Sequence, residues 1–359
     1  MKIQELNLRN YRNYDKASVR FEPGMNLILG NNAQGKTNLL ESLVYLSLTR
    51  SFRINEDEKL IRDGCEYAML ECTADNQRLK IILHPKGKSL FLNKIPIRKS
   101  SEFIGKLNVV LFTPDDLGIF QDSPRERRKV INQEITKISS RYLTELNQYM
   151  NLLKDRNLLL KREKPDEVYL DTLDEKMIEL SGTIIEQRKK FIAKINEVID
   201  EEFRGLSGMQ EKIEVRYESC VKENTKEDLA EMYRNSRRRD LETHVTGNGI
   251  HREDMTFLMN GENVIYCASQ GQKRMIILAF KLALMRYIEE MTGQKAVVLL
   301  DDVFSELDTE KQKRLIQRIR NTEQCIITAA GIPSFLKSEN TAIYLVNDGE
   351  IRRAGAEYE

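Results

Sequence analysis

The spacing of hydrophobic and polar positions changes twice along the chain. Residues 1–121 carry short apolar runs separated by turn residues, a pattern typical of strands. Residues 125–204 repeat apolar positions at helical spacing, and the break at Lys164-Pro165-Asp166 predicts a helical hairpin. Short apolar runs return in the last third. The pattern therefore predicts an α/β lobe formed by residues 1–121 and 245–359, with a mainly helical arm lobe, residues 122–244, inserted into it.

Two of the apolar runs predict buried strands of one mixed sheet. Met25–Leu29 precedes a glycine-rich segment and then an apolar stretch at helical spacing. Ala296–Asp302 is apolar until it ends in two carboxylates. Because both runs belong to the lobe that surrounds the arm, we expect them to share a sheet. The other predicted elements are a meander over Tyr67–Val110, the strands Val109–Phe112, Ile213–Tyr217, Cys325–Thr328 and Ile343–Val346, a hairpin of Met255–Met259 with Val264–Cys267, and an amphipathic helix Lys273–Met291.

The segment after the first of these strands fits the phosphate-loop pattern G-x-x-x-x-G-K-[ST]. Its residues are Gly30, Asn31, Asn32, Ala33, Gln34, Gly35, Lys36 and Thr37. Strand, glycine loop and helix together indicate nucleotide binding, because backbone N–H groups and the helix N-terminus then surround a phosphate chain. Lys36 would reach the β- and γ-phosphates of ATP, and the Thr37 hydroxyl would bind Mg²⁺.

Two further segments extend the expected site. Asp301 can hold Mg²⁺ directly or through water, and Asp302 stands where a carboxylate can polarise the attacking water. Ser269-Gln270-Gly271-Gln272 precedes a predicted helix, which Ser269 can cap, and the bare Gly271 amide lets a phosphate oxygen approach. Alone, this segment equally fits an ordinary capped helix after a turn. Its presence beside the other two elements favours a phosphate contact.

The composition bears on three classes of binding partner: nucleic acid, zinc and membranes. Lys and Arg total 57 against 56 Asp and Glu, so any nucleic-acid contact requires a local basic patch. The five cysteines show no C-x-x-C spacing and the chain has three histidines, which disfavours a structural zinc site. No apolar run approaches membrane-spanning length, and the N-terminal residues do not resemble a signal peptide. We therefore expect a cytoplasmic protein without a membrane partner.

Basic residues gather in clusters that have two interpretations. The clusters are Lys86, Lys88, Lys94, Arg98 and Lys99 on the predicted meander; Arg125, Arg127, Arg128 and Lys129 at the start of the arm; Arg188, Lys189 and Lys190 in its second helix; and Arg237, Arg238 and Arg239. Each cluster can face DNA. Each can equally be a solvated helix face, or an edge strand protected from aggregation. The sequence alone leaves this choice open.

The order of the motifs resembles that of ABC-type ATPases: phosphate loop, S-x-G-Q signature, acidic strand, then Ser305-Glu306-Leu307-Asp308. The spelling SQGQ, the short arm and several local strings resemble the bacterial RecF family of recombination mediators over nearly the whole chain. The strings are NYRNY from Asn10, SFR from Ser51, FTPDDL from Phe112, Ser123-Pro124 with Arg127-Arg128, and HRED from His251.

The resemblance implies an ABC-type ATPase head in which ATP lies between two head-to-tail subunits. Lys36, Thr37 and Asp301 would bind ATP from one subunit. Ser269 and Gly271, with Gln272 in the same signature, would reach its γ-phosphate from the other subunit. ATP binding would thus form the dimer and hydrolysis would dissolve it, which makes the nucleotide state a clamp on DNA.

The resemblance also assigns roles to neighbouring residues. Arg53 lies where SMC-like relatives carry an arginine near the phosphates, and Arg12 and Asn13 are candidates for contacts near the base or the α-phosphate. Asp302 stands where most ABC-type proteins have glutamate, which fits a slow switch. Two family features differ: Ala329 takes the place of the switch histidine, so Thr328 is the candidate sensor, and Asp115-Asp116 lies in the region of the glutamine loop.

We therefore expect a RecF-like protein of DNA replication and recombinational repair with a weak, DNA-dependent ATPase activity. It would bind single-stranded, gapped and duplex DNA through phosphates, and would help RecO and RecR load RecA, with induction of the SOS response. Three alternatives remain: an SMC-like head that tethers DNA, a transporter nucleotide-binding subunit, and a scaffold with a relic ATP site. The hairpin break at Pro165 and the SQGQ spelling disfavour the first two.

Overall fold

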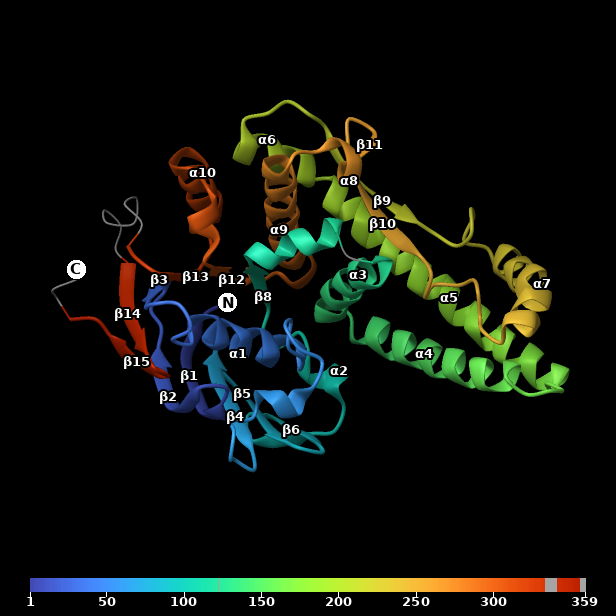
Figure 1. The fold of residues 1–359 in the computed structure, drawn as a ribbon, viewed down its shortest axis with the longest axis horizontal. Coiled ribbons are helices and arrows are strands. Elements are labelled where there is room, and N and C mark those ends of the chain that lie inside the picture. Colours follow the sequence, from blue (N-terminus) through green and yellow to red (C-terminus); the bar gives the residue numbers. More distant parts are fainter. Residues whose placement is uncertain (122, 333–340, 356–359) are drawn as a thin grey trace. The chain divides into compact units, whose positions relative to one another are not determined.

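The computed structural model describes residues 1–121, 123–332 and 341–355. The chain divides into two compact units, shown in Figure 1. The first unit consists of Met1–Leu117, Glu201–Met209 and Arg274–Glu359, and the second of Gly118–Asp200 and Gln210–Lys273. The second unit begins at Gly118 and ends at Lys273, where the expected arm spans residues 122–244, and residues 201–209 inside that arm group with the first unit.

An antiparallel sheet forms one layer of the first unit. Its strand order among the described residues is β2-β1-β4-β5-β6-β7. The strands are β1 (Ile3–Tyr11), β2 (Tyr14–Arg20), β4 (Ala68–Ala74), β5 (Gln77–His84), β6 (Gly87–Leu92) and β7 (Ile95–Ile97). Short turns with residues at positive φ, such as Asn93-Lys94, join neighbours directly. The predicted N-terminal strands and meander are therefore confirmed, and they belong to one sheet.

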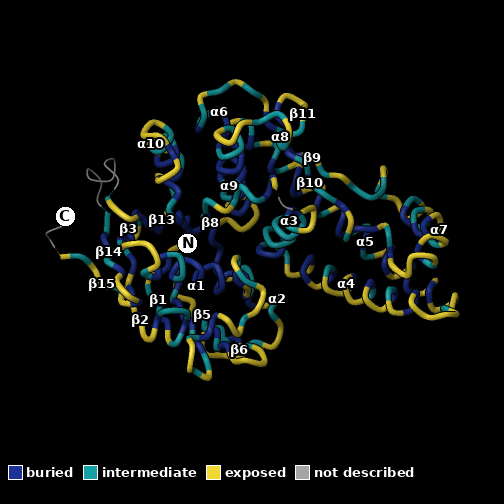
Figure 2. The backbone as a smooth tube through the Cα atoms, in the orientation of Figure 1, coloured by how far each residue is buried: buried dark blue, intermediate teal, exposed yellow. Residues whose placement is uncertain are grey.

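A mixed sheet forms the second layer, in the order β15-β14-β3-β13-β12-β8. Its strands are β3 (Gly24–Leu29), β8 (Val109–Phe112), β12 (Val297–Asp301), β13 (Gln324–Ala329), β14 (Thr341–Asn347) and β15 (Glu350–Arg353). All neighbours pair in parallel except β14 with β15. Strands β12 and β13 are buried along their length, as Figure 2 shows, which explains their mainly apolar sequences. The predicted shared sheet is confirmed, with β13 between β3 and β12.

Helix α1 (Lys36–Leu48) lies between the two sheets, and its apolar residues join both in one core. Helices α9 (Gln270–Thr292) and α10 (Thr309–Ile319) lie on the other side of β12 and β13 (Figure 1). Residues Met275 to Phe280 of α9 are buried without interruption, so this helix is not amphipathic there as predicted. Shorter helices are η1 (Asp57–Leu60), α2 (Ser100–Phe103), η2 (Pro114–Phe120), α6 (Ile199–Ser207) and η3 (Val303–Glu306).

The second unit combines the predicted helical hairpin with a small sheet. Helices α4 (Ser140–Leu160) and α5 (Glu167–Asn196) form the hairpin, and the break at Pro165 lies between them. Also present are α3 (Pro124–Ile138), α7 (Lys226–Thr243), α8 (Val264–Cys267), and β9 (Ile213–Glu218), β10 (Asp254–Met259) and β11 (Glu262–Asn263). The prediction of a strand over Val264–Cys267 is wrong, because the Asn263 side chain accepts a hydrogen bond from the Ile265 N–H and begins a helix there.

No helix among the described residues combines the length and the apolar composition needed to cross a membrane.

Candidate nucleotide-binding site

The candidate site lies at the carboxyl end of the parallel strands. Cross-strand pairs Asp301 with Thr328 and Thr328 with Ile28 bring the end of β12, the end of β13 and the start of the glycine loop to one edge of the sheet. Strand β8 ends beside β12, so Thr113 continues the same edge. Ligands of open parallel sheets bind at this edge, because the loops that leave the strands meet there.

The glycine loop has a backbone shape that other residues would disturb. A Cβ atom on Gly30 would lie 2.4 Å from the carbonyl oxygen of Val346, and Gly35 has φ +115° with the Asn13 amide against it. Ala33 also has positive φ, at 66°. Turns of this kind direct successive N–H groups into a concave anion-binding surface. Asn31 to Ala33 are exposed at the loop tip, where a ligand has access.

Lys36 is buried and turned back onto the loop. Its Nζ donates hydrogen bonds to the carbonyl oxygens of Gly30, at 2.6 Å, and Asn31, at 2.9 Å. Burial lowers the pKa of Lys36, while Asp302 and Asp301 oppose that shift. A buried ammonium is suited to an incoming phosphate, because the negative phosphate would pair with it and favour its charged form.

Thr37 and the acidic strand meet as the motifs predict. The Thr37 hydroxyl donates to Asp301 Oδ1 at 3.0 Å, and the Thr328 hydroxyl donates to the same oxygen at 2.7 Å. Burial raises the pKa of Asp301, and the two hydroxyl hydrogen bonds act against it. These oxygens are the hard ligands that Mg²⁺ prefers, and two protein ligands suffice where phosphates supply others. No group of three or more His, Cys, Asp or Glu residues that could hold a metal ion occurs among the described residues.

Asp302 is held by its backbone and leaves its carboxylate available. Its φ is 51°, in the left-handed region, and its N–H donates to the Thr328 hydroxyl at 3.1 Å. Within the described residues the Asp302 carboxylate makes no hydrogen bond or ion pair. A strained, unpaired carboxylate at a sheet edge is characteristic of a functional residue.

The predicted sensor and glutamine-loop residues differ in their surroundings. Thr328 is buried, and its hydroxyl donates to the Asp301 carboxylate and accepts from the Asp302 N–H. It therefore positions both acidic residues. Asp116 forms an ion pair with Lys281 of α9 at 2.8 Å and accepts a hydrogen bond from the Thr113 N–H. Asp115 is exposed at the same edge of the sheet. Asp116 therefore stabilises the fold, and Asp115 is the acid that a ligand can reach.

Arg12, Asn13 and Arg53 come together around α1. Asn13 donates to the carbonyl oxygen of Gln34 at 2.9 Å and accepts from the Asn38 side chain at 2.8 Å. Arg53 Nη1 donates to Asn38 Oδ1 at 2.9 Å. Arg12, with φ 53°, instead binds the carboxylate of Glu41 on α1. Asn13 and Arg53 thus support the loop through one shared asparagine.

Glu41 is the residue of this site that sequence reasoning missed. It is fully buried on α1, and its two oxygens accept from Arg12 Nε and Nη2 at 2.9 Å each. The Ser51 hydroxyl donates to it at 2.5 Å, and Arg53 Nη1 lies 3.8 Å away. A lone glutamate inside the apolar stretch Leu39–Leu46 was the available signal, because a buried carboxylate requires partners.

The hairpin of β14 and β15 makes a second unpredicted contact with the loop. The N–H groups of Asp348 and Gly349 donate to Gln34, to its side-chain oxygen at 2.5 Å and to its carbonyl oxygen at 3.3 Å. A Cβ atom on Gly349 would lie 2.4 Å from the Asn13 carbonyl oxygen. The hairpin turn therefore holds the phosphate loop through Gln34.

The signature segment lies in the second unit and begins α9. Gln272 N–H donates to the Ser269 hydroxyl at 3.2 Å, and the Ser269 N–H donates to Gln272 Oε1 at 2.9 Å, which is a reciprocal capping box. The predicted cap is confirmed. Ser269, Gln270 and Gly271 are exposed, and a Cβ on Gly271 would meet no described atom within 4 Å. The segment is thus an exposed helix N-terminus, capped by its own Ser269 and Gln272 side chains.

Several residues of the predicted basic clusters have structural partners. Arg127 binds Asp254 through two hydrogen bonds, Arg188 is buried against Glu253, and Arg237 bridges Asp171 and Asp174. Lys88 points into the first unit, where its Nζ donates to Tyr45, Thr49 and Asp57. These cations stabilise the fold. Lys94, Arg98, Arg125, Lys189 and Arg238 are exposed, and Arg238 pairs with Glu242 at 3.0 Å.

The mixed sheet, the glycine loop on α1 and the acidic end of β12 define the chain as a phosphate-loop ATPase head. Comparison with known proteins agrees. Residues 1–84 match the family model described as an AAA ATPase domain. The Smc head domain of Pyrococcus furiosus, 18% identical with a TM-score of 0.55, shares the fold.

Relatives over the full length make the assignment specific. The chain is 36% identical to the DNA replication and repair protein RecF of Clostridium perfringens, over 98% of this chain and 100% of that protein. RecF of Lactobacillus johnsonii is 36% identical over 92% and 93%. A solved structure of the recombination mediator protein RecF with ATP, from the RecFOR pathway, is 32% identical with a TM-score of 0.91 and covers 98% and 97%. The chain therefore belongs to the RecF family. This membership removes the transporter subunit as an interpretation of the motifs.

Proposed function

We propose that the chain is an ATP-dependent DNA-binding protein whose ATP sites form between two copies. The carrying observation is the contact of Thr37 with Asp301 beside an unpaired Asp302 carboxylate and a loop built for phosphate. Lys36 would pair with the β- and γ-phosphates, and Thr37 with Asp301 would hold Mg²⁺. Bound Mg²⁺ would neutralise phosphate charge. The ATP-bound structure of a RecF relative supports ATP as the ligand.

The residues near the loop have supporting roles in this proposal. Glu41 orients Arg12, and Asn38 orients Arg53 toward the phosphates. Asp302 would accept a proton from the attacking water, and its short side chain would keep hydrolysis slow. The exposed Ser269 and Gly271 would complete the site of a second copy, because the positive end of the helix dipole favours a γ-phosphate.

The biological role follows from the relatives. We infer that the ATP dimer retains single-stranded, gapped or duplex DNA in the cytoplasm through phosphate contacts, and that slow, DNA-dependent hydrolysis releases it. The RecFOR context of the solved relatives supports a part in recombinational repair with RecO and RecR, which would load RecA. The α4–α5 hairpin is a single pair of helices of 21 and 30 residues, and it is too short for an SMC-like tether.

Sedimentation tests the proposal with no nucleotide, with ADP and with ATP·Mg²⁺, each with and without a gapped duplex at fixed salt. We expect a dimer only with ATP, and DNA only on the dimer. Lys36→Met should lose ATP binding about 100-fold and the dimer with it. Ser269→Arg is the matched control: it should bind ATP as a monomer and fail to dimerise, because its long side chain blocks the interface.

Dimers of either variant with ATP would contradict the two-copy site. A wild-type monomer in every nucleotide state would favour the scaffold with a relic site. ATP hydrolysis measured in parallel, with and without DNA, separates loss of assembly from loss of chemistry.

A further inference from the structure

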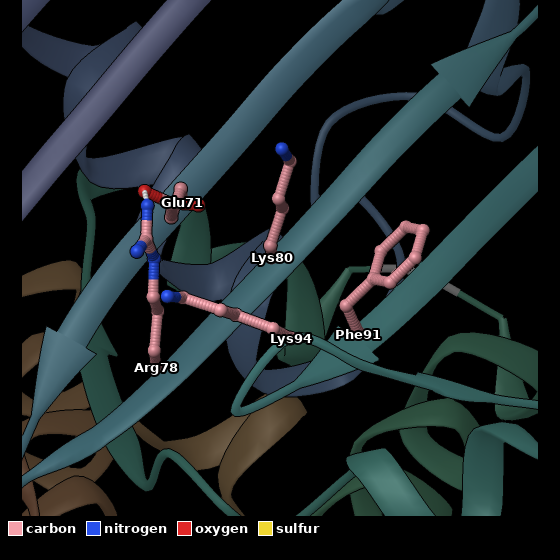
Figure 3. A pocket seen from close by; sticks show the side chains of 5 residues that line it. All are labelled: Glu71, Arg78, Lys80, Phe91 and Lys94. Atoms are coloured by element: carbon pink, nitrogen blue, oxygen red, sulfur yellow. Dashed lines mark hydrogen bonds and ion pairs between the residues drawn. The ribbon is translucent and has the colours of Figure 1, made fainter.

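A cavity of about 300 Å³ lies on the face of the antiparallel sheet that points away from α1. Glu71, Arg78, Lys80, Phe91 and Lys94 line it (Figure 3). Its base is one row of cross-strand partners, with Glu71 opposite Lys80 and Lys80 opposite Phe91. Phosphate-loop chemistry does not use these residues, which come from β4, β5, β6 and the turn after it.

Two contacts fix the shape of this cavity. Arg78 Nη2 donates to Glu71 at 2.6 Å, so the guanidinium lies against β4, as Figure 3 shows. The turn that carries Lys94 is held by Asn93, which exchanges two hydrogen bonds of 2.8 Å with the backbone of Arg78. Lys94 therefore stays over the cavity without an ion pair of its own.

The cavity carries more positive charge than its surroundings neutralise. Glu71 is occupied by Arg78, and in the described part of the chain neither Lys80 nor Lys94 forms an ion pair or a hydrogen bond. The register of β1, β2 and β4 places Lys16 and Arg9 on the same face of the sheet. The ammonium groups of Lys80 and Lys94 thus lie on one side of the half-buried Phe91 ring, the side toward Arg78 (Figure 3).

We propose that this cavity binds an unpaired nucleotide of single-stranded DNA, with the base on Phe91 and the flanking phosphates on Lys80 and Lys94. An aromatic ring on an open sheet with cations beside it matches the two needs of single-stranded nucleic acid, stacking and phosphate neutralisation. A duplex buries its base faces and would leave Phe91 unused. An acidic peptide would satisfy the lysines and would not stack on the ring. The inference rests on the proposed DNA binding, to which it adds a site and a preferred strandedness.

The natural chain contains no tryptophan, so Phe91→Trp creates a single fluorescent reporter in the cavity. We titrate the full-length variant with ATP·Mg²⁺ and a dye-labelled oligo-dT, and record tryptophan quenching and dye anisotropy together. Quenching should follow the anisotropy, because a stacked base quenches the indole. A blunt duplex of equal length and a poly-glutamate peptide are the comparison ligands, and neither should quench.

Charge variants provide the second measurement. Lys80→Glu and Lys94→Glu should each weaken oligo-dT binding about tenfold and reduce its salt dependence by about one ion. Lys86→Glu is the matched control, since it makes the same change at an exposed turn of the same sheet outside the cavity. Phe91→Leu should weaken binding by about fivefold or more, and Phe91→Tyr should preserve it. Circular dichroism and ATP binding verify that each variant is folded.

The outcomes separate the two proposals. Anisotropy without quenching, with the Lys80 and Lys94 variants equal to Lys86→Glu, would place DNA elsewhere and overturn only the cavity. Quenching by poly-glutamate or by the duplex would replace the single strand by another ligand and overturn it too. Absence of any DNA binding by the wild type would overturn the proposed function together with this inference.

Discussion

The two units bury charge in opposite ways. In the arm, Arg188 lies almost fully buried, and every nitrogen of its guanidinium has a partner: Tyr142, Ile250, Glu253 and Asn132. At the sheet edge, Asp302 has no such partner among the described residues. Its neighbours Lys36 and Asp301 both have pKa values shifted against their charged forms, first of all by burial.

The difference shows which buried charges carry function. A charge whose hydrogen bonds are complete has nothing left for a ligand and contributes specificity of packing. A charge without such partners at the edge of a sheet can still bond to a ligand, which makes it a candidate functional residue. Arg188 and Arg127 appear as parts of basic clusters in the sequence, and the structure assigns both to the scaffold.

Removing a buried charge whose hydrogen bonds are all satisfied within the fold should have the largest effect on stability. Arg188→Met leaves the Glu253 carboxylate buried without its cation, and we expect the free energy of unfolding to fall by about 3–5 kcal/mol. Urea denaturation measures the change. Lys189→Met, an exposed neighbour on the same helix, should change it by less than about 0.5 kcal/mol. Equal effects of the two variants would remove the distinction between the units.

His251 tests the arm by pH. Burial lowers its pKa to about 4, with Arg252 and Arg128 acting in the same direction and Thr246 and Asp240 against it. The folded state therefore excludes a proton that the unfolded chain accepts, so stability should fall as pH drops from about 6.5 to 4, by at most about 3 kcal/mol.

The measurement for His251 is the urea midpoint against pH for wild type and His251→Gln. The difference between the two curves should vary with pH in that window and be constant above it. The imidazole accepts from Tyr149 at Nδ1 and donates from Nε2 to the Thr246 carbonyl, which glutamine can imitate in part. Parallel curves would show that His251 is not the titrating group.

Glu41 lies between the two cases, because residues of the candidate nucleotide site form the hydrogen bonds and ion pairs that neutralise its carboxylate. Glu41→Gln should lower the free energy of unfolding by about 2 kcal/mol and weaken ATP binding about tenfold, since an amide cannot accept both Arg12 nitrogens. Calorimetry of ATP binding and thermal unfolding measure both effects. Glu58→Gln, the same change at an exposed site, is the control. Lost stability with unchanged ATP affinity would assign Glu41 to the scaffold.

The unpaired carboxylate should have the smallest effect on stability. Asp302→Asn keeps a residue that tolerates positive φ and removes no described contact of the side chain, so unfolding should change by less than about 1 kcal/mol. ATP hydrolysis should fall by about 100-fold or more while the ATP dimer persists. Phosphate release and sedimentation measure the two. Unchanged hydrolysis would assign water activation to another group.

Local pattern carried much of the prediction. The strand before the glycine loop, helix α1, the acidic strand and the break at Pro165 depend on neighbours within a few residues, and the structure confirms them. The one strand placed wrongly, Val264–Cys267, shows the limit of the same rule. A short apolar run fits a strand or a helix, and a side-chain cap from Asn263 decided it.

The sequence by itself determined that a phosphate-loop motif is present, because the glycines, Lys36 and Thr37 are adjacent along the chain. Only the tertiary structure decided which charges join that motif. Thr37 and Asp301 are 264 residues apart, Arg12 and Glu41 are 29 apart, and Arg188 and Glu253 are 65 apart. Such pairs depend on the register of non-neighbouring strands and on helix packing, which local periodicity does not encode. The packing around each charged side chain then determines whether it finds a partner within the fold or keeps hydrogen-bonding atoms free for a ligand.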